Sequence, residues 1–209
     1  MKTNKVNEVL QFPDGQAFEE KLTMILADEN AGVNAVIALL DVDHFMHVND
    51  DFGHDAGDRV LIELGQYLQK GVEGQGEIYR IQGDEFGILF NADLEKEDAF
   101  LLMEQLRRGL DIKLPDGEQV TISVGIAAAF EDASRYQELV RKAESAMFRV
   151  KYAGRNKVAL CREEKMIPKT SHYTSDQLKR LTKLSKREGI GEAILLREAL
   201  DMLLKRYDV

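Results

Sequence analysis

Two short acidic segments, each joined to apolar runs, constrain the fold of this chain more than any other feature. The first is Asp41–Asp43 (DVD), which directly follows the apolar run Asn34–Leu40. The second is Gly83–Phe86 (GDEF), which lies between the apolar runs Ile78–Ile81 and Gly87–Phe90. Short apolar runs bounded by turn residues are typical of buried strands. The sequence therefore predicts a central strand that ends in carboxylates, beside a hairpin whose turn carries more of them.

Carboxylates at the end of one strand and in the turn of an adjacent hairpin can converge on one point. Acidic groups that meet there repel one another unless a cation lies between them. Hard oxygen ligands favour Mg²⁺ or Mn²⁺, which usually arrives with a phosphate. A metal-dependent nucleotide enzyme is the first hypothesis. The alternative is two solvated acidic turns without a chemical role.

The rest of the first 160 residues predicts an α/β sheet covered by helices, because apolar runs alternate with amphipathic segments. The predicted strands are Asn34–Leu40, the hairpin Glu77–Phe90, Val120–Phe130 and Lys157–Leu160. The predicted helices are Phe45–Phe52, Asp55–Val72, Glu95–Leu110 and Ser134–Tyr152.

Four longer motifs surround the acidic segments. They are DVDHFMHVNDDFGHDAGD (Asp41–Asp58), YRIQGDEFGILF (Tyr79–Phe90), TISVGIA (Thr121–Ala127) and AESAMFRVKYAGRNKV (Ala143–Val158). In this order and spacing they resemble the GGDEF family of diguanylate cyclases, over about residues 7–160. The resemblance implies an α+β fold with a palm-like nucleotidyl-cyclase sheet that is antiparallel at its centre. It also implies that GTP is the substrate.

The resemblance further implies roles for single acidic residues. Asp41 and Asp84 would hold two divalent ions, Mg²⁺ or Mn²⁺, with the backbone carbonyl of Val42 as a further ligand. Glu85 would support the ions, so that the expected catalytic residues are Asp41, Asp84 and Glu85. The ions would neutralise the triphosphate, activate the 3′-hydroxyl and stabilise the leaving pyrophosphate. For Asp43, structural support is the better interpretation.

The residues that the resemblance assigns to the substrate are Phe45, Asn49, Asp58, Gly83, Lys151 and Arg155. Asn49 and Asp58 match positions that recognise guanine, whose N1–H and 2-amino groups can donate to a carboxylate. Lys151 and Arg155 match cations that hold the β- and γ-phosphates. Taken alone, Asn49 and Asp58 are also explained as turn and helix-surface residues. The two cations also complement the dipole at a helix C-terminus.

Several positions depart from the family pattern. Gln82 replaces the usual first glycine of the signature, and its side chain can crowd the nucleotide or require another turn. Met46 replaces a lysine, which removes a positive charge near the phosphates, and Gly15 replaces an arginine. Glu73 and Gly76 stand where an Arg-x-x-Asp motif would bind the product, so feedback inhibition by that route is not expected. Gln82 and Met46 favour an alternative, a transcription regulator that binds GTP or a cyclic dinucleotide without catalysis. It is opposed by the retained residues Asp41, Asp84, Lys151 and Arg155.

A second unit is expected at residues 162–209, after a first domain at residues 1–161. Residues 162–209 carry 11 basic and 8 acidic residues, a net +3, whereas residues 1–161 carry 17 basic and 29 acidic residues, a net −12. The tail reads as an extended segment, Lys169–Thr174, then a helix capped by Ser175 and a second helix to the C-terminus. Its leucine spacing resembles the ribbon-helix-helix family, whose two chains pair their strands and enter the major groove of DNA.

That resemblance implies a homodimer, and DNA as a partner through residues 166–209. The outward side chains of the paired strands would be Lys169, Ser171 and Tyr173. A strand and two helices of this size cannot bury a core alone, which also favours dimerisation. A purely structural dimer is a third reading, but it leaves the guanine and metal positions unexplained.

The remaining features predict a cytoplasmic protein without a membrane partner. No apolar run approaches the length of a membrane span, and the N-terminal residues are too short and polar for a secretory signal. The single cysteine, Cys161, excludes an internal disulfide and is typical of a reducing compartment.

Overall fold

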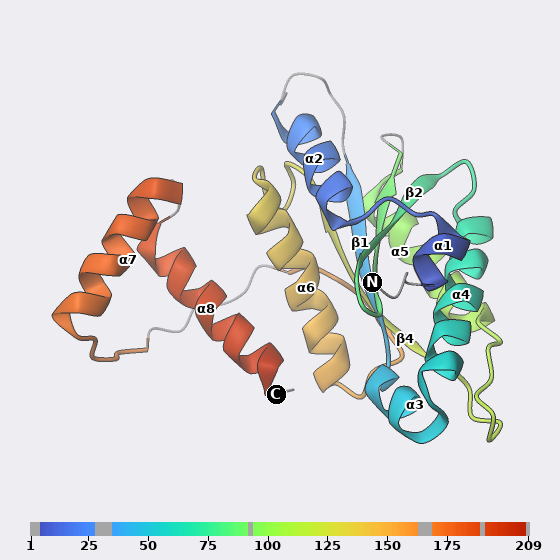
Figure 1. Cartoon of the computed structure of the whole chain (residues 1–209). Helices are drawn as coiled ribbons and strands as arrows, with labels where there is room; N and C mark the ends of the chain where they lie inside the picture. Colours follow the sequence, from blue (N-terminus) through green and yellow to red (C-terminus); the bar gives the residue numbers. More distant parts are fainter. Residues whose placement is uncertain (1–4, 28–34, 92–93, 163–168, 189–190, 208–209) are drawn as a thin grey trace. The chain divides into compact units, whose positions relative to one another are not determined.

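The computed structural model describes residues 5–27, 35–91, 94–162, 169–188 and 191–207. The chain divides into two compact units, Met1–Glu163 and Glu164–Val209 (Figure 1). The division falls just after the expected boundary at Cys161.

The first unit is built on a five-stranded sheet in the order β2-β3-β1-β4-β5. The strands are β1 (Val36–Val42), β2 (Gly76–Gln82), β3 (Glu85–Phe90), β4 (Ile122–Ala128) and β5 (Val158–Leu160). The central strand β1 is antiparallel to both β3 and β4, β2 is antiparallel to β3, and only β4 and β5 are parallel. The predicted antiparallel-centred sheet is therefore confirmed.

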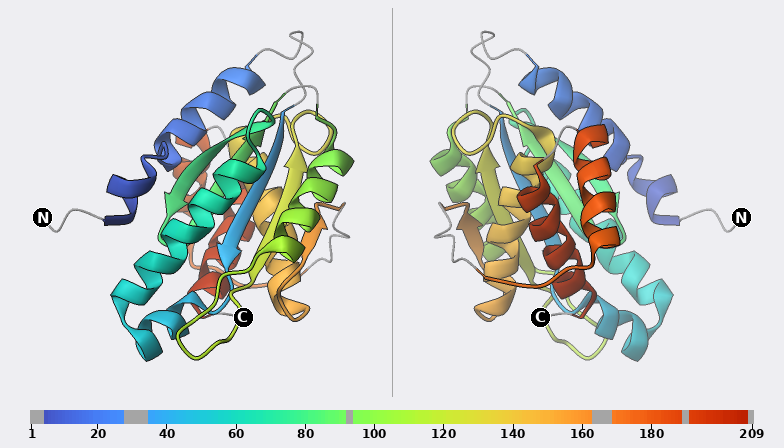
Figure 2. Two further views of the ribbon diagram at one scale, coloured as in Figure 1. Left: turned by 90° about the vertical axis from the view of Figure 1, so that its right-hand side faces the viewer. Right: turned by 90° about the vertical axis from the view of Figure 1, so that its left-hand side faces the viewer.

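Helices cover both faces of this sheet. They are α1 (Lys5–Leu10), α2 (Gly15–Leu26), α3 (Phe45–Phe52), α4 (His54–Gly71), α5 (Lys96–Gly109) and α6 (Tyr136–Tyr152). Figure 2 shows α4 and α5 on one face and α2 and α6 on the other. The predicted helices are present with small shifts at their ends, whereas α1 and α2 had not been predicted.

Strand β1 is buried along its whole length because both of its faces meet helices. Leu39 packs in the same cluster as Phe18 of α2, and Leu40 packs in the cluster that contains Leu64 of α4. Successive side chains of a strand point to opposite faces. Asp41 therefore lies on the face that α6 covers.

The segment before α2 lies along the outer edge of β2. The backbone N–H of Arg80 donates to the carbonyl of Pro13 at 2.8 Å, and Asp14 forms a parallel bridge with Arg80. The Asp14 carboxylate then caps α2 by accepting from the N–H of Ala17 at 3.0 Å. One short segment thus both pairs with the edge strand and begins a helix.

The second unit contains α7 (Ser175–Glu188) and α8 (Glu192–Arg206). Thr174, rather than Ser175, caps α7. Its hydroxyl accepts from the N–H of Gln177 at 3.2 Å, and the Gln177 side chain accepts from the N–H of Thr174 at 2.9 Å. No helix among the described residues is both long and apolar enough to cross a membrane.

The expected strand over residues 169–174 is not formed in the single chain. These residues are exposed and have no regular secondary structure. A strand needs a neighbour to satisfy its backbone hydrogen bonds, and a ribbon of this kind takes its neighbour from a second chain.

Candidate functional site

The sheet brings the acidic residues of the two sequence segments together. Asp41 lies opposite Glu85 in the register of β1 with β3, and Asp84 lies in the turn that precedes β3. Burial raises the pKa of Asp41 to about 6, and the negative charge of Asp84 contributes to the increase, with a smaller contribution from Glu85. Burial is the larger cause, and the contributions of Asp84 and Glu85 reflect repulsion among neighbouring carboxylates.

Lys151 of α6 is the cation beside this group. Its Nζ lies 2.7 Å from Oδ2 of Asp41, and its charge opposes the increase in the pKa of Asp41. Both side chains lie on the face of the sheet that α6 covers. The lysine that the sequence assigned to a phosphate therefore contacts a predicted metal carboxylate.

The turn between β2 and β3 accommodates Gln82 without backbone strain. The left-handed residue of this turn is Gly83, with φ +51°, and Gln82 does not have a positive φ. The exposed Gln82 side chain donates from Nε2 to Oε2 of Glu85 at 3.2 Å. The register of β2 with β3 shifts between Arg80 and Gln82.

Arg80 of β2 supports the same turn and was missed in the sequence. Its Nη2 donates to the carbonyl of Gly83 at 2.7 Å, and its Nη1 donates to Oδ1 of Asn7 in α1. Burial lowers its pKa, while the charges of Asp58 and Asp84 oppose that decrease. A signal was available, because a charged residue in a strand directly before a functional turn needs a partner.

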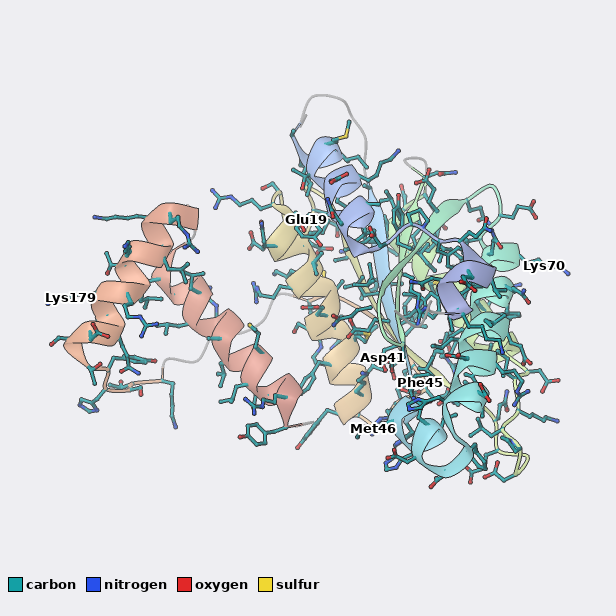
Figure 3. The ribbon with its side chains drawn as sticks, viewed as in Figure 1. Glu19, Asp41, Phe45, Met46, Lys70 and Lys179 are labelled. Atoms are coloured by element: carbon teal, nitrogen blue, oxygen red, sulfur yellow. The ribbon has the colours of Figure 1, made fainter. Side chains whose placement is uncertain are left out.

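The predicted guanine residues lie where α3 meets α4. Gly57 permits the close approach of the two helices, since a Cβ atom there would lie 2.1 Å from Oδ1 of Asn49 and 3.1 Å from Cζ of Phe45. Asp58 follows Gly57 in α4 and is partly buried. Figure 3 shows Phe45 and Met46 at the start of α3, close to Asp41 at the end of β1. Met46 is 69% exposed.

Asp43 has a structural role, as the sequence suggested. Its buried carboxylate accepts hydrogen bonds from the hydroxyls of Thr121 at 2.7 Å and Ser123 at 2.6 Å, and from the N–H of Asn156 at 3.0 Å. The bonds join the end of β1 to the start of β4 and to the loop after α6. Arg155 lies in that loop and is partly buried.

The oxygen donors fit a Mg²⁺ or Mn²⁺ ion that arrives with its substrate. Within the described ranges, no three His, Cys, Asp or Glu side chains form a group that could hold a metal by themselves. Mg²⁺ characteristically binds through one or two carboxylates, with water and phosphate oxygens completing its coordination. Asp41, Asp84 and the Val42 carbonyl would supply this limited set, and a cation there would offset the charge of Asp84, which adds to the effect of burial on the pKa of Asp41.

Three residues predicted to face DNA lie in the second unit. Lys169, Ser171 and Tyr173 are exposed in the segment before α7. The structure thus leaves them accessible.

Comparisons with known proteins agree with both sequence resemblances. The family model for the GGDEF domain, described as diguanylate cyclase, matches residues 8–157. A ribbon-helix-helix domain model matches residues 167–208. The crystal structure of the GGDEF domain of YfiN (TpbB) from Pseudomonas aeruginosa has a TM-score of 0.68 and 27% identity, and the match covers 74% of this chain and 99% of that one.

Two curated relatives are similar in sequence. The probable diguanylate cyclase DgcC of Escherichia coli is 37% identical over 127 residues, which are 59% of this chain and 34% of DgcC. Diguanylate cyclase DgcP of Pseudomonas aeruginosa is 36% identical over 152 residues, which are 70% of this chain and 22% of DgcP. The chain therefore spans about a third or less of the length of these relatives.

Proposed function

The chain belongs to the GGDEF family of diguanylate cyclases, and we propose that it condenses two GTP molecules into cyclic di-GMP. In each of two transfers, the 3′-hydroxyl of one GTP loses its proton and attacks the α-phosphorus of the other. The bond to the β-phosphate breaks, so that two pyrophosphates leave in total. Each catalytic unit holds one substrate, and two units must therefore meet face to face.

The acidic group at the end of β1 would bind the ions. Divalent ions held by Asp41, Asp84 and the Val42 carbonyl would supply Lewis-acid activation of the 3′-hydroxyl and charge neutralisation of the triphosphate. Glu85, opposite Asp41 in the sheet, adds negative charge that favours a cation there. Asp43 keeps the end of β1 in place through its three hydrogen bonds.

The remaining site residues would bind GTP itself. Asp58 accepts from the N1–H and 2-amino groups of guanine, and Asn49 contacts the same base. Adenine lacks this pair of donors, so the site selects GTP over ATP. Lys151 and Arg155 belong to the C-terminal end of α6 and the loop that follows it, and they hold the β- and γ-phosphates. Phe45 and Gly83 complete the contacts.

The observation that carries this proposal is the cluster of Asp41, Asp84, Glu85 and Lys151, in which Glu85 lies opposite Asp41, Lys151 forms an ion pair with Asp41, and burial together with the charge of Asp84 raises the pKa of Asp41. The test is to incubate the full-length protein with GTP and Mg²⁺ or Mn²⁺ and to measure cyclic di-GMP by mass spectrometry. We expect product from the natural protein and none from Asp84→Ala. Equal product from both proteins would exclude the assigned metal site.

A second candidate function is that of a transcription regulator that binds GTP or a cyclic dinucleotide without turnover. The exposed Met46 favours it because it removes a positive charge near the triphosphate, and Gln82 favours it because its side chain can crowd the nucleotide. Tight GTP binding without product in the same assay would support this candidate.

The second unit would pair two chains and bring their catalytic units together as a homodimer. Its exposed Lys169, Ser171 and Tyr173 would contact DNA through the paired strands. If both ligands bind, DNA occupancy and nucleotide occupancy would bias each other by the same free energy. Sedimentation equilibrium tests the pairing. A duplex-DNA mobility shift that weakens with salt tests the contact with DNA.

A further inference from the structure

We propose that Arg107 and Asn156, which lie outside the assigned substrate contacts, are positioning residues that hold Arg155 in place for the triphosphate of GTP. This inference rests on the proposed function, because it assumes that Arg155 binds phosphate. It goes further in assigning to α5 a part in substrate binding.

The loop after α6 has an unfavourable backbone that needs support. Gly154, Arg155 and Asn156 are three consecutive residues in the left-handed region, with φ of +98°, +60° and +49°. Glycine adopts this region freely and asparagine tolerates it, whereas arginine has no such preference. Without hydrogen bonds to the rest of the unit, we expect the loop to leave this conformation and the Arg155 side chain to move from its position.

Two backbone hydrogen bonds hold the loop to the rest of the unit. The N–H of Arg155 donates to the carbonyl of Val150 in α6 at 2.9 Å. The N–H of Asn156 donates to the Asp43 carboxylate at 3.0 Å. The second bond links the loop directly to the strand that carries Asp41.

The Asn156 side chain makes the third attachment. Its Oδ1 accepts a hydrogen bond from Nη1 of Arg107 in α5 at 2.7 Å. The guanidinium of Arg107 is oriented by Glu104, which accepts from its Nε at 2.8 Å and from its Nη2 at 2.7 Å. Both side chains are largely buried, at 13% and 19% exposed, and the hydrogen bonds from Arg107 lower the pKa of Glu104. An oriented, partly buried guanidinium is a rigid donor.

Arg108 offers a matched control on the same helix. Its Nε donates to the same Glu104 carboxylate at 2.8 Å, and its side chain is 72% exposed. Among the described residues, Arg107 and not Arg108 donates to the Asn156 side chain. Arg108→Met therefore removes an arginine and a Glu104 contact while the support of the loop stays intact.

The test compares GTP with GMP, which shares the guanine but lacks the β- and γ-phosphates. Binding of each nucleotide is measured by calorimetry with Mg²⁺ in full-length Arg107→Met, Asn156→Gly, the double variant, Arg108→Met and Arg155→Ala. Asn156→Gly removes the bond to Arg107, while glycine still adopts the left-handed backbone and keeps the N–H that donates to Asp43.

We expect Arg107→Met and Asn156→Gly each to weaken GTP binding about 5-fold and the double variant no further, since both remove one interaction. Binding of GMP by these variants, and of GTP by Arg108→Met, should equal that of the natural protein. Arg155→Ala should weaken GTP binding about 10-fold or more.

Unchanged GTP binding in Arg107→Met and Asn156→Gly, beside a loss in Arg155→Ala, would overturn the inference and leave the phosphate role of Arg155 intact. Equal losses of affinity for GTP and GMP would show that Arg107 and Asn156 act only on the structure of the unit, and this outcome would also overturn the inference. No loss in Arg155→Ala would remove the assigned phosphate contact, and the inference with it. If Arg107→Met does not fold, Asn156→Gly carries the same comparison.

Discussion

The two units of the chain differ in how much of their apolar surface they bury. In Met1–Glu163, side chains such as Phe86, Leu64 and Ile126 are completely buried between the sheet and its helices. In the described part of the second unit no side chain is buried, and Leu178, Leu200 and Leu203 are 44%, 53% and 50% exposed. Apolar side chains that are spaced along helices and left exposed need another surface.

The two units therefore reach stability in different ways. The catalytic unit completes its core from its own residues, so its site can be ordered in one chain. The second unit leaves its core incomplete, and its stability would come from pairing, as the ribbon-helix-helix resemblance implies. Mutations should therefore act on stability in one unit and on association in the other.

The largest expected effect is on the core of the first unit. Phe86→Ala should lower the free energy of unfolding by about 3–5 kcal/mol, because it leaves a cavity among fully buried side chains. Leu200→Ala should change the same transition by less than about 0.5 kcal/mol, since its side chain is already half exposed. Urea unfolding followed by circular dichroism measures both. Similar losses in the two variants would show that the units do not differ as described.

Removal of the second unit should slow catalysis only by lowering the effective concentration of one GGDEF domain near another. A protein that ends at Glu163 should fold with an unchanged melting temperature. At nanomolar concentration it should make cyclic di-GMP about 100-fold more slowly, because the second catalytic unit is no longer held nearby. The initial rate is measured against protein concentration for both lengths. A shortened protein with full activity at low concentration would contradict pairing by the second unit.

Asp41 is a buried acidic residue of the first unit, and its contribution to the free energy of unfolding depends on pH. Its pKa is raised from the ordinary value of 3.8 to about 6 in the folded protein, chiefly by burial, so the folded state holds the proton more tightly. The stability conferred by the protonated form is lost as pH rises from about 4 to about 6.

Without metal, Asp41→Asn should therefore raise the free energy of unfolding by about 2 kcal/mol at pH 8 and change it little at pH 4. Lys151 already lowers the pKa of Asp41, so the loss of this ion pair is part of the expected change. Thermal unfolding with EDTA at the two pH values measures this, and the variant should make no cyclic di-GMP. A stabilisation that is equal at both pH values would contradict the burial of a charged Asp41.

The smallest expected effect concerns the altered signature residue. Gln82→Gly should change the turnover rate by less than about 3-fold, because Gln82 has no left-handed backbone that glycine would relieve. Met46→Lys in the same assay serves as a comparison, since it restores a charge instead of a backbone preference. A large gain from Gln82→Gly would show that the glutamine side chain obstructs the nucleotide.

Much of the fold follows from local patterns. Apolar runs predicted the strands, and amphipathic segments predicted α3, α4, α5 and α6. Helices α1 and α2 were missed, because the only prediction made for that region concerned Gly15 and no secondary structure was predicted there. The missing strand at residues 169–174 has a physical reason, because hydrogen bonds to a second chain cannot form in one chain.

The site was predictable in its residue types but not in its contacts. The carboxylates were identified because they end apolar runs. Their pairing required the register of β1 with β3, which depends on packing across some 40 intervening residues. The contacts of Lys151 with Asp41, of Arg80 with Asn7 and of Arg107 with Asn156 join distant segments. No local pattern encodes such pairs.

The pairing of Pro13 and Asp14 with the edge of β2 has a consequence for solubility. An open edge strand offers unsatisfied N–H and carbonyl groups to any other strand, and proteins avoid aggregation by covering such edges. Here the cover begins with a proline and continues into the cap of α2. Shortening the N-terminus past Asp14 would uncover the hydrogen-bonding groups of β2, and the protein would then self-associate edge to edge on concentration. Residues outside the predicted chemistry of the first unit thus cover its edge strand.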